Sequence, residues 1–475
     1  MIILGTNSIK DTGFNVDNSV RLDGSSSYMT KSMGTPTNID KYSFSFWVKR
    51  SKLGVQQSIF RSTNGAASND SHVTFQADDT LRFEEYGGSA SIGKLQTTQV
   101  FRDISAWYSI LLVYDSGNGT AGNRMRMYVN GTEVTAFGTD NNPSQNADSY
   151  FNRSGETLSF GRTPYSGGGN YFSGYVAELV MCDGQALTPT DIGEFDEDSG
   201  IFKPINVSGL TFGTNGFYLD FEDSANLGND ANGGTDFTEV NLAATDQSTD
   251  TCTNNFATLN PLAQTTTKGT VSQGNLEYDR SGSSDGWVSI LSTIGASSGK
   301  YYAEVKIIDV GSPSQGCVLG FLNLDESNIQ SSSSTYLGAA TADAGMGWYS
   351  VGNVFRQGGH VNIINSYTDN DIVMLAMDLD NGFCYFGKNG SWENSGDPTS
   401  GSSGTGGYAT SNMTANGTYC FAVSCREAGN VQMNFGSPSF AISSGNTDGD
   451  GYGNFEYAPP SGYYALNTKN LAEYG

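Results

Sequence analysis

Two segments of the sequence combine aromatic side chains with polar groups of the kind that bind sugars. Residues 164–172 (PYSGGGNYF) and residues 347–360 (GWYSVGNVFRQGGH) are both rich in glycine, which lets a backbone approach a ligand closely. An aromatic ring offers a flat apolar platform, and amide or guanidinium groups offer hydrogen bonds. We therefore predict glycan-binding residues in both segments, with capping of a β-sandwich end as the alternative role. The candidates are Tyr165, Asn170, Tyr171, Trp348, Tyr349 and Arg356.

Groups that could catalyse a reaction are scarce. The chain has two histidines, so a Ser-His-Asp or Cys-His site would have to use one of them. Hydrolysis of a glycosidic bond needs two carboxylates across a cleft, and the nearest pair that would share a strand face is Asp220 and Glu222. Glu84 and Glu85 are adjacent, so on a strand they would point to opposite faces. We predict no catalytic residues and a protein that is not an enzyme. The histidines, which we interpret as ordinary polar residues, are His72 and His360.

One acidic segment has the spacing of a cation-binding loop. Residues 445–454 (GNTDGDGYGN) carry oxygen-bearing side chains at alternating positions, as in the first half of an EF-hand loop. Glu456 comes too early to supply the closing bidentate carboxylate of such a loop. Asn446, Asp448 and Asp450 are therefore candidate Ca²⁺ ligands, and an ordinary turn with Asx hydrogen bonds is the alternative. We expect no other cofactor.

The elements that would position these residues are β-strands. In residues 42–48 (YSFSFWV), every second residue is apolar and would lie on the same face of a strand. Residues 107–114 (WYSILLVY) form a nearly continuous apolar run, which is typical of a strand covered on both faces. In residues 124–134, the pair Asn130-Gly131 predicts a tight hairpin turn. The strand before that turn would point Met125, Met127 and Val129 inward. Helical periodicity is almost absent, so we predict an all-β fold.

Chain length indicates more than one domain. A single core rarely exceeds roughly 250–300 residues, and the chain has 475. Residues 201–265 differ from their surroundings because they hold one basic and eight acidic residues, with short apolar pieces such as residues 216–221 that could dock onto a neighbouring domain. We predict two antiparallel β-sandwich (jelly-roll) domains, at residues 1–200 and 266–475, joined by an acidic, loop-rich connector at residues 201–265.

Charge and cysteine spacing exclude several classes of partner and site. The net charge is −25, which opposes binding to nucleic acid or to an anionic membrane surface. We find neither a run of about 20 apolar residues nor a signal peptide, so we expect no membrane insertion and synthesis in a cytoplasm. The six cysteines form no CxxC motif, and Cys420 and Cys425 would point to opposite faces of one strand. We expect free, buried thiols.

The first predicted sandwich resembles the laminin-G/concanavalin A-like jelly roll over about residues 15–198. The resemblance implies a fold whose members include binding proteins and glycoside hydrolases. It is carried, in the strand order of that family, by residues 19–28 (SVRLDGSSSY), 42–49 (YSFSFWVK), 126–134 (RMYVNGTEV) and 174–187 (GYVAELVMCDGQAL).

The second predicted sandwich resembles a SPRY-type domain over about residues 270–440. SPRY modules usually recognise their partners through the loop end of the sandwich, which is similar to the position of residues 347–360. Both families host many functions, so the fold alone does not give the function. The resemblance is carried by residues 299–306 (GKYYAEVK), 371–378 (DIVMLAMD) and 379–392 (LDNGFCYFGKNGSW).

Three further segments are similar to tail-fibre and other virion surface proteins of bacteriophages, notably marine ones: residues 213–223 (GTNGFYLDFED), 246–261 (DQSTDTCTNNFATLNP) and 455–471 (FEYAPPSGYYALNTKNL). The resemblance implies a virion adhesion protein, either a tail fibre or spike or a capsid fibre. Its expected partners are a host cell-surface polysaccharide or another envelope component, other virion proteins, and further copies of itself, with a trimer as our expectation. The alternatives are a structural virion protein that binds no glycan and, less favoured, a capsule-degrading glycosidase.

Overall fold

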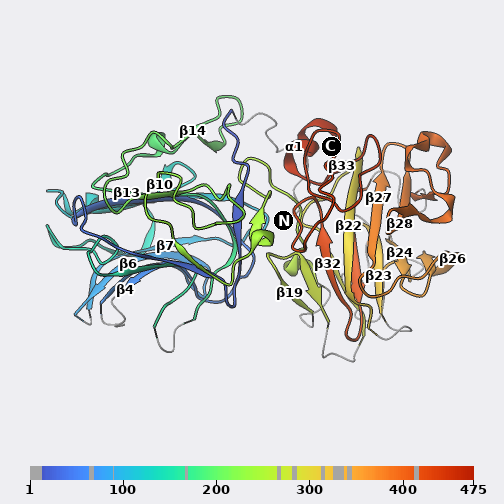
Figure 1. The fold of residues 1–475 in the computed structure, drawn as a ribbon, viewed down its shortest axis with the longest axis horizontal. Helices are drawn as coiled ribbons and strands as arrows, with labels where there is room; N and C mark the ends of the chain where they lie inside the picture. The colour runs from blue at the N-terminus through green and yellow to red at the C-terminus, as the bar shows by residue number, and fades with distance from the viewer. Residues whose placement is uncertain are drawn as a thin grey trace. The chain divides into compact units, whose positions relative to one another are not determined.

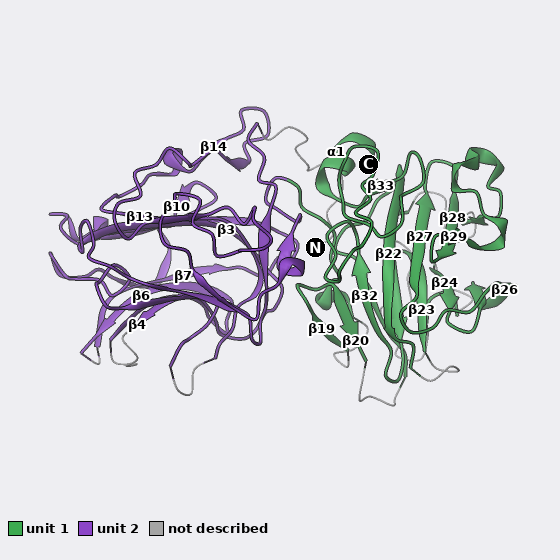
Figure 2. Cartoon of the chain, viewed as in Figure 1, with its two compact units in different colours: residues 1–10, 254–475 green, residues 11–253 purple. Residues whose placement is uncertain are grey.

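The computed structural model is nearly all-β (Figure 1). It describes residues 13–63, 69–88, 90–165, 169–264, 269–280, 286–311, 316–324, 336–339, 345–410 and 417–475. The described part of the chain divides into two compact units, which we call the N-terminal unit (residues 13–253) and the C-terminal unit (residues 254–475) (Figure 2). The predicted all-β class with antiparallel sheets is confirmed. The described residues contain no helix that could cross a membrane.

The N-terminal unit consists of two antiparallel sheets packed face to face, with a small hairpin beside them. One sheet contains, in spatial order, β10 (Thr132–Glu133), β9 (Met125–Val129), β8 (Tyr108–Asp115), β3 (Lys41–Arg50), β13 (Ser173–Asp183), β1 (Ser19–Asp23) and β18 (Gln247–Ser248), with β16 (Phe217–Leu219) paired to β13. The other contains β11 (Phe137–Asn141), β7 (Ala90–Val100), β6 (Thr80–Gly87), β5 (Asp70–Phe75), β4 (Gln57–Thr63), β12 (Thr157–Phe160), β2 (Tyr28–Ser32) and β17 (Thr238–Val240). The hairpin pairs β14 (Gly193–Phe195) with β15 (Phe202–Pro204).

Aromatic residues fill the space between the two sheets because alternate residues of each strand must face the core. Phe44 of one sheet stacks on Phe60 of the other with ring centroids 5.1 Å apart, and both rings are fully buried. The predicted hairpin forms between β9 and β10, with positive φ angles of 49° at Asn130 and 74° at Gly131. Met127, on the strand before this turn, is fully buried as expected.

Most of the segment expected to be a connector belongs to the N-terminal sandwich. Its strands β16, β17 and β18 pair with β13, β2 and β1, and the boundary between the units falls after residue 253 instead of at residues 200 and 265. Phe217 and Phe237 lie in the core, with ring centroids 4.8 Å apart. The apolar pieces therefore do pack, while the Asn-, Asp- and Gly-rich turns between them give the segment its loop-like composition.

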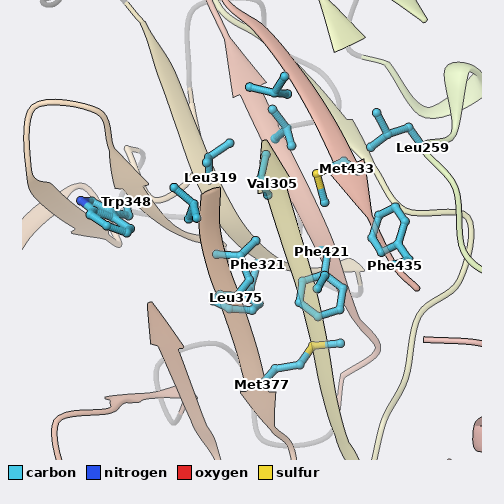
Figure 3. Close-up of a cluster of buried hydrophobic side chains, with 14 of the residues drawn as sticks. Leu259, Val305, Leu319, Phe321, Trp348, Leu375, Met377, Phe421, Met433 and Phe435 are labelled. Carbon is cyan, nitrogen blue, oxygen red and sulfur yellow. The ribbon is translucent and has the colours of Figure 1, made fainter. Parts of the chain in front are cut away.

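The C-terminal unit is a second sandwich, whose core is drawn in Figure 3. One sheet contains β19 (Thr270–Ser272), β20 (Glu277–Asp279), β32 (Asn430–Asn434), β22 (Lys300–Asp309), β27 (Ile372–Asp378), β28 (Phe383–Lys388) and β29 (Ser391–Trp392); β30 (Tyr408–Ala409) pairs with β28, and β33 (Tyr464–Ala465) pairs in parallel with β22. The other contains β21 (Val288–Leu291), β31 (Tyr419–Cys425), β23 (Cys317–Asn323), β24 (Gly345–Tyr349), β25 (Asn353–Arg356) and β26 (Gly359–Ile363).

Helices are few and short in the described residues. The α-helix α1 (Thr468–Tyr474) buries Leu471 against the core of the C-terminal unit. Its first turn is capped by Asn467, whose side chain accepts a hydrogen bond from the backbone N–H of Asn470. The 3₁₀ helices are η2 (Ala121–Asn123), η3 (Pro189–Asp191), η4 (Ala244–Asp246), η5 (Pro261–Ala263), η8 (Glu393–Ser395) and η9 (Pro398–Ser403).

Glu85 is an acidic residue inside the N-terminal core. Burial raises the pKa of its carboxyl group to about 7, even though hydrogen bonds from neighbouring hydroxyl groups act in the opposite direction. Oε1 accepts hydrogen bonds from the Tyr42 hydroxyl at 2.7 Å and from Ser149 Oγ at 2.8 Å, and Oε2 accepts one from Ser71 Oγ. The folded state therefore holds a proton on this group more tightly than the unfolded chain does.

This pKa shift predicts that the N-terminal unit loses stability as pH rises. The contribution of Glu85 is fully present below the unfolded value of 4.5 and is lost as pH rises through about 7. Glu85→Gln should flatten this dependence, which for one such group amounts to about 3 kcal/mol. Urea unfolding of the full chain between pH 4.5 and 8 measures the change. Glu84→Gln is the control, because the pKa of Glu84 is lowered and its effect lies at lower pH. An unchanged pH dependence in Glu85→Gln would contradict the assignment.

Candidate functional site

One sheet of the N-terminal unit carries a row of polar side chains across its outer face. The register pairs Arg61 of β4 with His72 of β5, His72 with Glu84 of β6, and Glu84 with Lys94 of β7. Facing side chains on paired strands lie on the same side of the sheet. The residues beside them in the sequence point to the other side and are buried in the core: Phe60, Val73, Phe83 and Leu95. Because the apolar side chains face the core, strand alternation places the charged side chains on the outer face.

This row lines a shallow pocket of about 300 Å³, which we call the charged pocket. Its lining combines three cations, two carboxylates, a histidine and one aromatic ring, so it offers both hydrogen-bond donors and acceptors. The lining residues are Arg61, Asp70, His72, Arg82, Glu84, Tyr86 and Lys94.

The histidine is held between two carboxylates. His72 Nδ1 lies 2.9 Å from Asp70 Oδ1, and His72 Nε2 lies 3.3 Å from Glu84 Oε2. Arg61 donates from both Nε, at 2.9 Å, and Nη2 to the second oxygen of Asp70. A side chain fixed by two partners loses little further freedom when a ligand binds, so this arrangement is preorganised.

Two cations, Arg82 and Lys94, also lie near the Glu84 carboxylate. Burial favours the protonated form, but the hydrogen bond and charge of His72 and the charge of Lys94 together lower the pKa of Glu84 below its ordinary value. Lys94 Nζ lies 3.8 Å and Arg82 Nη1 lies 3.6 Å from Glu84 Oε2. Lys94 is thus beyond hydrogen-bonding distance of this carboxylate oxygen, and both cations are partly exposed, with 23% of each side chain accessible.

One of the two predicted glycan-binding segments lies beside the charged pocket. The guanidinium of Arg61 lies 4.6 Å from the ring centroid of Tyr165, which is half-buried. Tyr171 is also half-buried, and its ring centroid lies 6.4 Å from that of Tyr28. Asn170 is exposed, with a positive φ of 38°, and its carbonyl accepts a hydrogen bond from the Ser58 N–H. Two of the glycines in this segment, residues 167 and 168, lie outside the described residues.

The other predicted segment runs along the strands β24, β25 and β26 instead of forming a loop, and the rings of Trp348 and Tyr349, which were expected to contact a glycan, are buried. Trp348 is fully buried in the main core, and its indole N–H donates to the Asn365 carbonyl at 3.1 Å. Tyr349 is 9% exposed and packs against Trp287 on the other face of the sheet. Arg356 is half-buried and donates to the Ala409 carbonyl at 2.9 Å. Trp348 and Tyr349 end the strand β24, which is covered on both faces.

The acidic loop at residues 445–454 forms a hydrogen-bonded turn. Asp448 Oδ1 accepts from the N–H groups of Asp450 and Tyr452, and Oδ2 accepts from the Ala465 N–H and the Asn470 side chain, all within 3.0 Å. Asn446 donates to the Glu456 carbonyl at 3.0 Å.

Within the described parts of the chain, no three His, Cys, Asp or Glu side chains are placed to hold a metal ion. The hydrogen bonds that Asp448 accepts from the N–H groups of Asp450 and Tyr452 are those expected of the alternative Asx turn. Calcium binding there stays a prediction.

The carboxylates flagged as a possible hydrolytic pair lie beside a third acid that the sequence did not indicate. Glu178 sits at a bulge of β13 with a φ of 48°, and burial raises its pKa to about 7, helped by the charges of Asp220 and Glu222. Its Oε2 accepts a hydrogen bond from the Tyr218 hydroxyl at 2.8 Å, and it is 7% exposed. Glu178 does not line the charged pocket. It was missed because it stands within an otherwise apolar strand.

Residues 23–193 match the family model described as the concanavalin A-like lectin/glucanases superfamily. The matched residues lie in the N-terminal unit and include every residue of the charged pocket. No curated protein matches the chain.

Three solved structures are similar to parts of the chain. The SPRY domain of human HERC1 is 17% identical, with 37% of this chain and 96% of that chain covered at a TM-score of 0.29. A heptameric SAP-like pentraxin from Limulus polyphemus is 18% identical, and the similarity covers 36% of this chain and 78% of that chain at a TM-score of 0.29. A protein from Bacteroides ovatus described as carbohydrate-binding is 15% identical, and the similarity covers 48% of this chain and 61% of that chain at a TM-score of 0.32.

The different burial of the two aromatic segments predicts that replacing an aromatic side chain by alanine lowers stability by different amounts. Trp348→Ala should lower the free energy of unfolding of the C-terminal unit by about 3–5 kcal/mol, because it leaves a cavity in the core. Tyr165→Ala should cost about 1 kcal/mol or less, since the ring lies at the surface. Urea denaturation of both variants measures these values. A Trp348→Ala protein as stable as the wild type would show that this ring is not a core residue.

Proposed function

We propose that the protein is a virion attachment protein that binds a polysaccharide of the host cell surface through the charged pocket. The observation that carries the proposal is the row of preorganised polar side chains from Arg61 to Lys94 with Tyr165 beside it. The match of residues 23–193 to a lectin/glucanase family model supports a sugar as ligand. The virion location rests on the resemblance of the sequence to bacteriophage fibre proteins.

The chemistry of the pocket suits a saccharide. Sugar hydroxyl groups both donate and accept hydrogen bonds, and the pocket offers cations and carboxylates within one surface. The rings of Tyr86 and Tyr165 can contact the apolar face of a sugar ring. A volume of about 300 Å³ is at the small end for ligand pockets, so it would hold a short stretch of a polysaccharide and leave the rest in solvent.

A small, open site of this kind binds weakly by itself, and attachment would depend on several copies acting together. Linking sites raises overall avidity by 10²–10⁴-fold without any new contact. We therefore propose that the protein acts as a homo-oligomer, a trimer in the arrangement we expect, and that other virion proteins hold it on the particle. Binding, without cleavage of the polysaccharide, is sufficient for this role.

A second candidate role, assembly with another virion protein, is favoured by the edge strand β26. This strand ends its sheet and exposes two apolar side chains, Val361 at 40% and Ile363 at 69%. An exposed edge strand can pair with a strand of another chain. This role would require no glycan ligand.

The proposal predicts which substitutions abolish glycan binding. Arg82→Ala or Lys94→Ala should each weaken binding of host surface polysaccharide at least 10-fold, because each removes a partly exposed cation from the pocket. Tyr165→Ala should weaken it by about 5-fold or more. A glycan array that includes host polysaccharide, run with and without Ca²⁺, identifies the ligand and the role of calcium, and calorimetry gives the affinities.

Arg102→Ala is the matched control, since Arg102 is exposed, pairs with Asp79 and does not line the pocket. Unchanged affinity in both Arg82→Ala and Lys94→Ala would contradict the proposed site. Absence of binding to every glycan, together with co-assembly with another virion protein, would favour the structural role.

A further inference from the structure

Two cysteines of the C-terminal unit lie in contact across neighbouring strands. Cys317 begins β23 and Cys425 ends β31, and the antiparallel register places them opposite each other. Their Sγ atoms are 2.9 Å apart, which is about 0.9 Å longer than a disulfide bond. Both side chains are fully buried.

The backbone hydrogen-bond pattern of these strands favours a disulfide bond between Cys317 and Cys425. The Arg426 N–H donates to the Gly316 carbonyl at 3.1 Å, so this neighbouring pair is a hydrogen-bonded pair. Hydrogen-bonded and non-hydrogen-bonded pairs alternate along an antiparallel ladder, which makes Cys317 and Cys425 a non-hydrogen-bonded pair. Such pairs have Cα atoms about 4.5 Å apart, within the range that a disulfide spans.

The other cysteines do not compete for either thiol. Cys420 lies on the same strand as Cys425 but faces Leu322 and belongs to the cluster on the opposite side of the sheet. Cys384 lies on β28 of the other sheet, opposite Met377. Cys182 and Cys252 belong to the N-terminal unit.

We propose that Cys317 and Cys425 form a disulfide bond when the protein meets an oxidising environment. The oxidant would be a small-molecule disulfide such as oxidised glutathione. One cysteine thiolate attacks it, forming a mixed disulfide and releasing one glutathione thiolate. The second cysteine thiolate then displaces the other glutathione. Two protons and two electrons leave the cysteine pair, and one oxidised glutathione becomes two reduced molecules.

The bond would join strands that are far apart in the sequence. It would fix β23 to β31, which also pairs with β21, and would close a loop of 108 positions. Closing a long loop restricts the unfolded chain and so stabilises the folded one. The expected free thiols would then describe the protein only before it leaves a reducing cytoplasm.

The folded protein itself should oxidise slowly. Burial raises the pKa of the Cys425 thiol well above its ordinary value, and the neighbouring Cys317 adds to this effect. Little thiolate is therefore present at neutral pH, and thiolate is the reacting species. The bond would form mainly while the sandwich folds or opens, so refolding is the informative condition.

The test is to refold the full-length protein in a glutathione redox buffer, block the remaining thiols and map the peptides by mass spectrometry. We expect a loss of about 2 Da, a cross-linked peptide containing Cys317 and Cys425, and a Tm about 10 °C higher that returns to the reduced value with dithiothreitol. Cys317→Ser and Cys425→Ser should each lack both the cross-link and the shift.

Cys420→Ser is the matched control, because it removes a buried thiol from the same strand and should keep the cross-link. Six blockable thiols after refolding of the native sequence would overturn the proposal, and so would a cross-link that joins either residue to Cys384 or Cys420. These outcomes need no variant to fold.

Discussion

The pairing of β5 with β6 is the constraint on which the charged pocket depends. Val73 faces Phe83 in the aromatic core, and this pairing sets His72 opposite Glu84 on the outer face. A slip of one residue would exchange the two faces, exposing the apolar side chains and burying the charges. The packing of the core therefore helps to hold the polar row in place.

The same alternation explains two acids with opposite behaviour at adjacent positions. Glu84 faces outward, where His72 and Lys94 stabilise its charge and lower its pKa. Glu85 faces the core, where burial raises its pKa to about 7. One acid belongs to the surface that we propose for binding, and the other is predicted to lower the stability of the unit as pH rises through about 7. Neither role follows from composition, because the two residues differ only in the face on which they lie.

The sequence predicted the fold class and the opposite orientations of Glu84 and Glu85 because strand alternation is visible over five or more residues. It predicted the hairpin because the Asn130-Gly131 pair favours a tight turn. It could not place β16, β17 and β18, which are only two or three residues long. Trp348 in a glycine-rich segment has the same appearance whether it ends a buried strand or lies in a loop. The charged pocket was missed because its residues come from four strands and meet only through cross-strand register. The Sγ contact of Cys317 and Cys425 depends on register in the same way.

The central claim is that a saccharide contacts the outer face of β4 to β7. Hydroxyl-radical footprinting of the full-length protein, with and without a saturating fragment of the bound polysaccharide, tests it directly, since half-buried tyrosines react measurably with the radical. The account predicts that the ligand protects Tyr86 and Tyr165 and leaves Tyr452 and Tyr457 of the C-terminal unit, which are equally half-buried, unchanged. Protection confined to the C-terminal tyrosines would contradict it.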